Sequence, residues 1–299
     1  MAHRTPAGHF AYSFAAAMRT PADYLLPRTT GEARRLQIQS ELLREATETL
    51  LGALELREPT SCIDIGCGTG DAMLMIARLA GQGARIVGLD LDTRPARARL
   101  EGEPRFELVQ GDLFSATPLP SAPFDLTFSR YLLHHLPDPA AAIARMWELT
   151  REGGTLAILD IDQRATTTYP SWWPYDQLEQ WIRDLYLKTG IDNHIGHKLP
   201  HLFEQAGIGK PDGTKVVGVI RTIAELSEFL PLLLDMIRGK LLEHAVASQA
   251  EIDRVDAELA TAPQQTSIYC YRPAAVGVWK RKRYDVTAMG LDPLAARGR

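Results

Sequence analysis

CIDIGCGTG, residues 62–70, is the stretch of sequence that decides the fold. Ile63 and Ile65 belong to a short apolar run that ends at Gly66, the pattern of a buried parallel strand followed by a glycine turn. Two more glycines follow at alternate positions and leave no side chain to keep a ligand away from the backbone. Residues 71–80, DAMLMIARLA, then place apolar side chains at near-helical spacing. We therefore predict a strand, a glycine loop and a helix N-terminus whose amides face a nucleotide-like ligand.

The glycine spacing and a nearby acid indicate which ligand this loop holds. A dinucleotide-binding loop has the pattern G-x-G-x-x-G, which admits a pyrophosphate, whereas residues 66–70 read G-x-G-x-G. Asp64 lies at the strand end, where a carboxylate repels a phosphate and suits a ligand amine. The D-x-G-x-G-x-G pattern resembles the first motif of the class I S-adenosylmethionine-dependent methyltransferases. The resemblance implies that S-adenosylmethionine is the cofactor, contacted by Asp64, Gly66, Cys67, Gly68 and Gly70.

Acids also follow the next two predicted strands. The strand in ARIVGLDLD delivers Asp90, where an open parallel sheet places an acid against a ribose diol, and Asp92 is the competing acid. The resemblance implies that Asp112, after the third strand, bonds the adenine amino group while the backbone of Leu113 meets a ring nitrogen. It further implies cofactor contacts from Leu91 and from two residues after the fourth strand, Ser129 and Arg130.

His134 and His135 are the only adjacent imidazoles in the chain and are the candidate catalytic residues. A histidine near its ordinary pKa can act as a general base worth roughly 10²- to 10⁴-fold in rate. The same side chains can instead cap a helix or line the adenine pocket. Because such a histidine recurs in the resembled family across different chemistries, we favour the structural or cofactor-lining role over the base.

The stretch REGGTLAILDID predicts the fifth strand, and the composition of the chain changes after it. Residues 163–203 form an insertion rich in aromatic side chains, which give an apolar or planar substrate a large contact area. We predict that Trp172 and Trp173, together with Tyr24, contact the substrate; the alternative is that the aromatics pack this segment onto the core. The other aromatics of the insertion are Tyr169, Tyr175, Trp181 and Tyr186.

The stretch GIDNHIGHKLPHLFEQAGI supports the same family and narrows it. It resembles a region found in methyltransferases of bacterial secondary metabolism, which implies a small-molecule, natural-product acceptor and a place in antibiotic biosynthesis. His194, His197 and His201 in this region also suggest a metal site. They lack a carboxylate or cysteine at fixed ligand spacing, so we predict structural roles and no metal.

Helical additions are expected on both sides of the methyltransferase motifs. Residues 1–58 predict a helical N-terminal cap with a short helix at 13–18 and an amphipathic helix at 31–54. We favour a packing role for it; the alternative is a cap that reaches into the site with Tyr12, Tyr24, Arg28 or Gln37. Residues 223–262 predict two helices broken near Pro231 and Gly239, which dock on the body; a lid or a homodimer contact is the alternative.

These elements together predict an α/β, Rossmann-like fold. Its sheet is doubly wound, seven-stranded and mainly parallel, with TKVVGVIRT as the sixth strand and IYCYRPAAVGVWKRK as the seventh. The predicted organisation is a helical cap over 1–58, a methyltransferase domain over 59–283 and a loosely held tail over 284–299.

Composition restricts the classes of partner. The net charge of -4 and pI near 6.1 provide no basic field for nucleic acid or an anionic membrane, so we expect a small-molecule partner. No apolar run approaches the roughly twenty residues that a membrane helix needs. Three sparse cysteines, Cys62, Cys67 and Cys270, predict reduced thiols in a cytoplasmic protein.

The implied activity is methyl transfer from S-adenosylmethionine to a small molecule. Two alternatives remain open at the level of sequence, because the cofactor motifs would be identical in each. One is a protein that uses the bound cofactor for cyclisation or rearrangement, and the other is a non-catalytic cofactor-binding regulator. Fold identifies the cofactor and not the acceptor.

Overall fold

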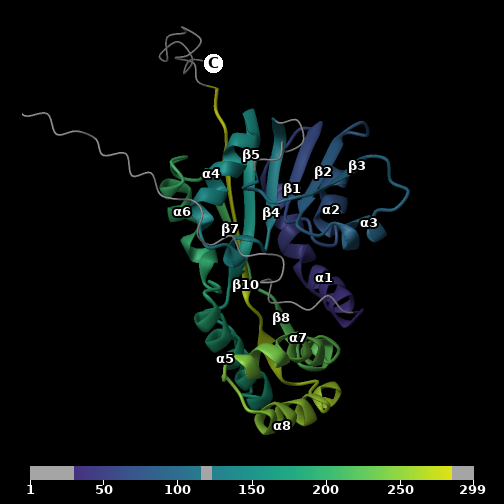
Figure 1. The fold of residues 1–299 in the computed structure, drawn as a ribbon, viewed down its shortest axis with the longest axis vertical. Helices are drawn as coiled ribbons and strands as arrows, with labels where there is room; N and C mark the ends of the chain where they lie inside the picture. Colours follow the sequence, from purple (N-terminus) through teal and green to yellow (C-terminus); the bar gives the residue numbers. More distant parts are fainter. Residues whose placement is uncertain (1–29, 116–122, 285–299) are drawn as a thin grey trace, which may run out of the picture.

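The computed structural model describes residues 30–115 and 123–284. Its centre is a seven-stranded sheet in the order β3-β2-β1-β4-β5-β10-β7 (Figure 1). Strands β1 to β5 run parallel, and β10 is antiparallel to both of its neighbours. The seven-stranded, mainly parallel Rossmann-like sheet is therefore confirmed. The strands are β1 (Ser61–Ile65), β2 (Arg85–Asp90), β3 (Phe106–Gln110), β4 (Phe124–Arg130), β5 (Thr150–Asp162), β7 (Gly213–Val217) and β10 (Ala274–Arg281).

Helices cover both faces of this sheet, as Figure 1 shows. Along β1, Cys62 faces the core shared with α1 and α2, whereas Ile63 and Ile65 face the core shared with α4 and α6. The strand is thus buried on both sides, which is why it reads as a continuous apolar run. These helices are α1 (Thr30–Ala53), α2 (Asp71–Leu79), α3 (Arg94–Arg99), α4 (Pro139–Leu149) and α6 (Leu199–Gln205), with the 3₁₀ turns η1 (Leu133–His135) and η2 (Ile195–Lys198).

The sixth and seventh predicted strands each divide in two, which corrects the sequence prediction. Only β7 and β10 join the main sheet; the other halves form a second, three-stranded sheet in the order β6-β9-β8. The divisions fall at Gly218, where a Cβ would lie 2.3 Å from the Tyr271 hydroxyl, and at Pro273, which has no N–H to donate. The small strands are β6 (Thr167–Tyr169), β8 (Ile220–Thr222) and β9 (Tyr269–Tyr271).

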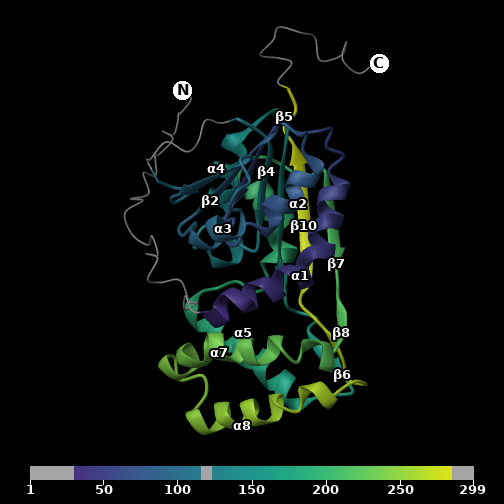
Figure 2. The same cartoon turned by 90° about the vertical axis from the view of Figure 1, so that its right-hand side faces the viewer.

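The remaining helices form a lobe with its own hydrophobic core below the main sheet (Figures 1 and 2). The break predicted near Pro231 and Gly239 is wrong, because α7 runs through both residues. Pro231 is tolerated since its missing N–H is one of the first four of the helix, which have no intrahelical acceptor. The chain breaks later, and Ser248 starts α8 with a capping box. The lobe contains α5 (Trp173–Thr189), α7 (Phe229–Glu243), α8 (Gln249–Leu259), η3 (Ala224–Leu226) and η4 (Ala262–Gln264).

Helix α1 lies between the sheet and this lobe, as Figure 2 shows. Leu50 and Leu54 pack in the core against the sheet. At the other end, Arg34 Nε donates to Glu228 Oε1 at 2.6 Å, just before α7 begins. The predicted helix at 13–18 and the residues Tyr12, Tyr24 and Arg28 lie outside the described residues. No helix in the two described segments is long and apolar enough to cross a membrane.

Gly88→Ala tests the packing of the glycine loop on the sheet. A Cβ at this position of β2 would lie 2.6 Å from Met73 Sδ and 2.9 Å from Cys67 Sγ, and both side chains are buried. We expect a loss of about 1–3 kcal/mol in the free energy of unfolding, seen as a lower melting temperature. Gly83→Ala, with nothing within 4 Å, is the matched control. Equal melting temperatures for the two variants would contradict this packing.

Candidate functional site

A cavity of about 200 Å³ lies at the carboxyl edge of the parallel strands. One end is formed by the glycine loop after β1 and the loop after β4, and the other end by α5, α7 and the chain between β9 and β10. The middle of α1, residues 35–46, forms part of the wall between them. The cavity therefore joins the sheet, α1 and the helical lobe, in the place where doubly wound folds hold ligands.

The glycine loop adopts a shape that side chains disfavour. Gly66, Gly68 and Gly70 all have positive φ, at 75°, 53° and 78°. The amides of Gly66 and Cys67 donate to the Leu89 carbonyl at 2.8 and 3.1 Å, and the amide of Gly68 donates to Asp90 Oδ2 at 2.8 Å. No atom lies within 4 Å of where a Gly68 Cβ would be, so this position leaves the cavity open. The end of β2 thus holds the loop against the sheet.

Asp64 lines this end of the cavity with an unsatisfied charge. Its side chain is 1% exposed, and neither carboxylate oxygen has a hydrogen-bond partner among the residues that the structure describes. Burial raises the pKa of Asp64 to about 7, and the nearby Arg130 opposes that shift. A buried carboxylate without a partner is costly, so this position is suited to a ligand cation.

Arg130 supplies the opposite charge on the same wall. Burial lowers the pKa of its guanidinium. Two hydroxyl groups of α1 hold the guanidinium in place: Nη1 donates to Thr47 Oγ1 at 3.2 Å and Nη2 to Ser40 Oγ at 3.4 Å. A half-buried cation beside a buried anion matches the α-carboxylate and α-amino groups of an amino acid. The amino-acid end of S-adenosylmethionine therefore fits this chemistry.

The other predicted cofactor residues lie around this end but not all in its wall. Asp64, Gly66, Cys67, Gly68 and Arg130 line the cavity. Asp90 and Asp112 lie at the ends of neighbouring strands β2 and β3, beside the loop, where Asp112 Oδ1 accepts from the Phe114 amide at 2.9 Å. The competing acid Asp92 is paired with Arg94 at 2.8 Å. The other predicted residues lie outside the wall. Gly70 packs on Leu100, and Ser129 Oγ donates to the Ile65 carbonyl. Leu91 is 39% exposed, whereas Leu113 is buried in the core.

His134 reaches the cavity from η1 and is held by a buried acid that sequence analysis missed. Its Nδ1 lies 2.6 Å from Asp160 Oδ1, and the same carboxylate accepts from the amides of Leu133 and Ile161 at 2.8 Å each. An aspartate at Nδ1 favours the tautomer that leaves Nε2 as a proton acceptor. His135 stacks on His134 with ring centroids 3.8 Å apart. The signal for Asp160 was present, because it is another acid near a strand end.

The far end of the cavity is lined differently from the prediction. Trp172 is 8% exposed within the lobe core, and Trp173 lies under the Arg254 guanidinium at 4.7 Å, so neither lines the cavity. The predicted contact of both rings with a substrate stays a prediction, and this cavity wall does not provide it. Trp172 instead fills part of the lobe's own core, whereas Trp173 is 39% exposed. Among the aromatics of the insertion, Tyr186 is the one in the cavity wall.

Helix α1 also contributes residues that its amphipathic pattern did not single out. Gln37 is exposed and bonded to Arg34, so its predicted reach into the site is not seen. Arg35, Gln39 and Ser40 line the cavity instead. From the lobe side, the polar lining residues missed by sequence reasoning are Gln163, Glu179 and Arg272. No motif marks them, since only packing brings them to one place.

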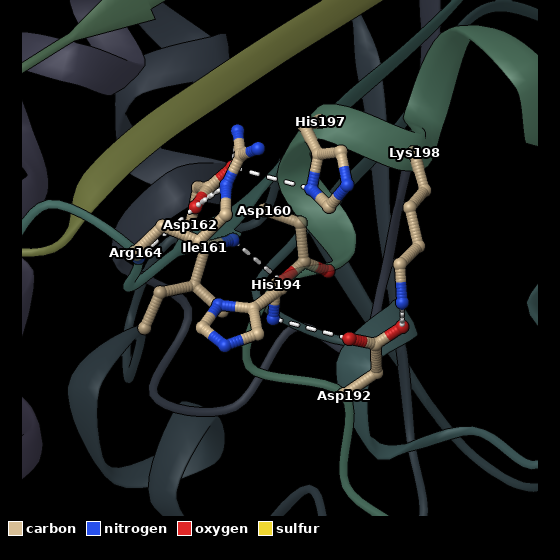
Figure 3. Close-up of polar contacts among 8 residues, drawn as sticks. All are labelled: Asp160, Ile161, Asp162, Arg164, Asp192, His194, His197 and Lys198. Atoms are coloured by element: carbon tan, nitrogen blue, oxygen red, sulfur yellow. Dashed lines mark hydrogen bonds and ion pairs between the residues drawn. The ribbon is translucent and has the colours of Figure 1, made fainter. Parts of the chain in front are cut away.

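His194 and His197, two of the three histidines shortly after α5, lie in a polar cluster with Asp162 and Asp192, shown in Figure 3. Arg164 and His197 both point toward Asp162, at 2.7 and 3.5 Å, and Lys198 points toward Asp192 at 2.5 Å. The cluster ties the end of β5 to η2. Over residues 30–115 and 123–284, no group of three or more histidine, cysteine or acidic side chains is arranged to hold a metal ion.

Comparisons with known proteins agree with this geometry. Residues 63–158 match the family model described as a methyltransferase domain. A similar curated protein is the uncharacterized 37.1 kDa protein in a Streptomyces fradiae transposon, 27% identical over 73% of this chain and 64% of its own length. Another is the 2-phytyl-1,4-naphtoquinone methyltransferase of Thermosynechococcus vestitus, 34% identical over 43% of this chain and 58% of that protein.

A third relative is the trans-aconitate 2-methyltransferase of an Azoarcus species, 32% identical over 44% of this chain and 50% of that protein. The chain thus spans between half and two thirds of the length of these relatives. Among solved structures, a Bacillus halodurans protein assigned as a methyltransferase shares the fold with a TM-score of 0.55 and 17% identity, over 80% of this chain and 100% of that chain.

Asp64→Asn tests the cost of the buried charge. The unfolded carboxyl loses its proton near pH 3.8 and the folded one near 7, so ionisation destabilises the folded ligand-free protein as pH rises through this window. We expect the variant to melt several degrees higher than the parent at pH 8, with a smaller difference at pH 5 because only part of the ionisation cost is present there, measured by calorimetry. A variant that melts no higher than the parent at pH 8 would contradict the assigned burial cost.

Proposed function

We propose that this chain, whose residues 63–158 match a methyltransferase domain, transfers a methyl group from S-adenosylmethionine to a small-molecule acceptor. One observation carries the proposal: the buried, unpartnered carboxylate of Asp64 beside a glycine loop with positive φ angles. A fold retains such a charge where a ligand cation compensates it. The domain match supports S-adenosylmethionine as that ligand.

Each residue at the glycine-loop end has a distinct role in this proposal. Asp64 binds the ligand amine and Arg130 its carboxylate. Gly68 allows close approach to the backbone, while Asp90 meets the ribose diol and Asp112 the adenine. When bound, the sulfonium supplies a methyl group already activated for transfer. The chain therefore needs mainly to align the acceptor and exclude water, and such positioning is worth effective molarities of roughly 10⁵–10⁸ M.

The acceptor lies, in this proposal, in the half of the cavity under the helical lobe. That half continues directly from the cofactor end, with His134 and His135 in its wall. The named relatives that act on trans-aconitate and on a naphthoquinone support a small-molecule acceptor. A natural-product acceptor, secondary metabolism and a cytoplasmic location extend this proposal and come from the sequence resemblance. The homodimer contact likewise stays a prediction.

His134 is the residue of the histidine pair better placed to take a proton from the acceptor. Asp160 fixes its ring and stabilises the positive charge that the ring would gain. His135 stacks on His134 and acts in this scheme as its packing partner. The lining role remains the competing assignment for both.

The experiment that tests the function is mass spectrometry of the purified protein incubated with S-adenosylmethionine and small-molecule extracts. Release of S-adenosylhomocysteine together with a product heavier by one methylene group is the expected result. Tight cofactor binding with neither signal across extracts and pure carboxylate, phenol and amine acceptors would contradict methyl transfer. That outcome would favour use of the bound cofactor for cyclisation or rearrangement, or a regulatory role.

Asp90→Ala should weaken binding of S-adenosylhomocysteine at least tenfold, because it removes the carboxylate assigned to the ribose and the acceptor for the Gly68 amide. Asp92→Ala is the matched control two residues away, where the side chain is paired with Arg94. Isothermal titration calorimetry measures both. Equal losses in the two variants, or none in Asp90→Ala, would remove Asp90 from the cofactor site.

Asp160→Asn tests whether His134 acts as a base. The change keeps the shape of the side chain but removes the charge that stabilises protonated His134. We expect kcat to fall roughly ten- to hundredfold and the acidic limb of its pH profile to shift, with affinity for S-adenosylhomocysteine unchanged. A change in cofactor affinity alone would assign His134 to the lining role. Melting temperatures control for loss of fold.

A further inference from the structure

The half of the cavity under the helical lobe carries an arginine whose side chain makes no hydrogen bond or ion pair with a described residue. Arg272 lines the cavity, and its guanidinium lies over the Phe229 ring, 4.6 Å from the centroid. Within the described chain, none of its side-chain N–H groups donates a hydrogen bond, and none pairs with a carboxylate within 4 Å. The edge of the guanidinium is therefore available to a ligand.

The backbone around Arg272 is fixed, so the side chain starts from a defined position. Its amide donates to the Val219 carbonyl at 2.9 Å, at the point where the chain passes from β9 in the small sheet to β10 in the main sheet. Pro273 follows and restricts the chain further. A guanidinium stacked on an aromatic ring can still donate from the N–H groups along its edge, which lie in its own plane. Two of these N–H groups can bind one carboxylate or phosphate together.

The surroundings favour an anion over a cation at this position. Arg35, 4% exposed, adds a second guanidinium to the cavity wall from α1. The one acid in this half of the wall is Glu179, whose Oε2 accepts from Gln163 Nε2. Gln163 in turn accepts from Asn193 at 2.9 Å, so the acid is engaged in a buried network. Burial raises the pKa of Glu179, and the nearby charge of Arg272 opposes that shift.

Much of the remaining lining is apolar, beside Gln39, Tyr186 and the two histidines. Ile182 of α5 and Leu233 and Met236 of α7 form the wall beside the two arginines. Such a surface contacts a hydrocarbon or ring and leaves the polar anchoring to a few groups. The cofactor's own carboxylate is already matched by Arg130 beside Asp64, so Arg272 has no assigned partner.

We propose that the acceptor is an apolar small molecule bearing a carboxylate or phosphate group, and that Arg272 binds this group. The inference rests on the proposed function, because it names the acceptor class of the same cavity. Arg272 is here a specificity-determining residue and takes no part in the transfer itself.

The test uses matched pairs of probes and isothermal titration calorimetry on the full chain. Phenylacetate, 4-phenylbutyrate and 6-phenylhexanoate are each compared with their neutral primary amides, and benzyl phosphate with benzyl alcohol. Each pair is titrated with and without saturating S-adenosylhomocysteine. We expect at least one anion to bind tenfold or more tightly than its neutral partner; the carboxylate and phosphate arms show which anion is preferred.

Variants link that preference to one side chain. Arg272→Gln should abolish it, and Arg272→Lys should retain part of it, because lysine keeps the charge but loses the fork. Arg254→Gln is the matched control, since Arg254 also stacks on an aromatic ring, Trp173, but is exposed and lies outside the cavity wall. It should keep the full preference. Melting temperatures and S-adenosylhomocysteine affinity verify that each variant is folded.

The outcomes separate this inference from the proposed function. No preference for any anion, or a preference that persists in Arg272→Gln, would overturn the assignment of Arg272 whether or not S-adenosylhomocysteine binds. Failure of the parent protein to bind S-adenosylhomocysteine, with an Arg272-dependent preference intact, would overturn the proposed function while upholding an anion site.

Discussion

The buried carboxylate of Asp64 is the constraint around which the site is arranged. Removing a charge from water costs several kcal/mol unless a partner compensates it, and the folded chain provides no hydrogen bond from a described residue. Part of the compensation is electrostatic, from Arg130, which would itself be costly alone. The two charges are kept near each other by the parallel pairing of β1 and β4, whose carboxyl ends meet at one edge.

Helix α1 makes this arrangement stable and also connects it to the lobe. Its hydroxyl groups, Ser40 and Thr47, are bonded to Arg130, while the same helix packs on the sheet through Leu50. The lobe has a separate hydrophobic core and contributes only a few polar groups to the cavity. One half of the site is therefore set by strand pairing, and the other by how the lobe packs against α1.

Local signals in the chain were sufficient for the parts of the fold built from single elements. The apolar run of β1 and the glycines after it predicted a strand and a loop at the right positions. Prediction failed where an element depends on a distant contact. The division between β7 and β8 falls at Gly218, against the Tyr271 hydroxyl more than fifty residues away in the sequence. The error at α7 was local instead, because Pro231 falls in the first turn of the helix, where its missing N–H has no intrahelical acceptor.

The sequence by itself determined the sheet, the glycine loop and the acids at its edge, because parallel strands are buried on both faces and bring their carboxyl ends together wherever they pair. Only the tertiary structure decided which side chains face the far end of the cavity. Trp172 packs in the lobe core. Glu179 and Arg272, which belong to no recognisable sequence motif, line the cavity wall. The physical reason is that helix periodicity places a residue on a face, but the packing of several elements determines what that face meets.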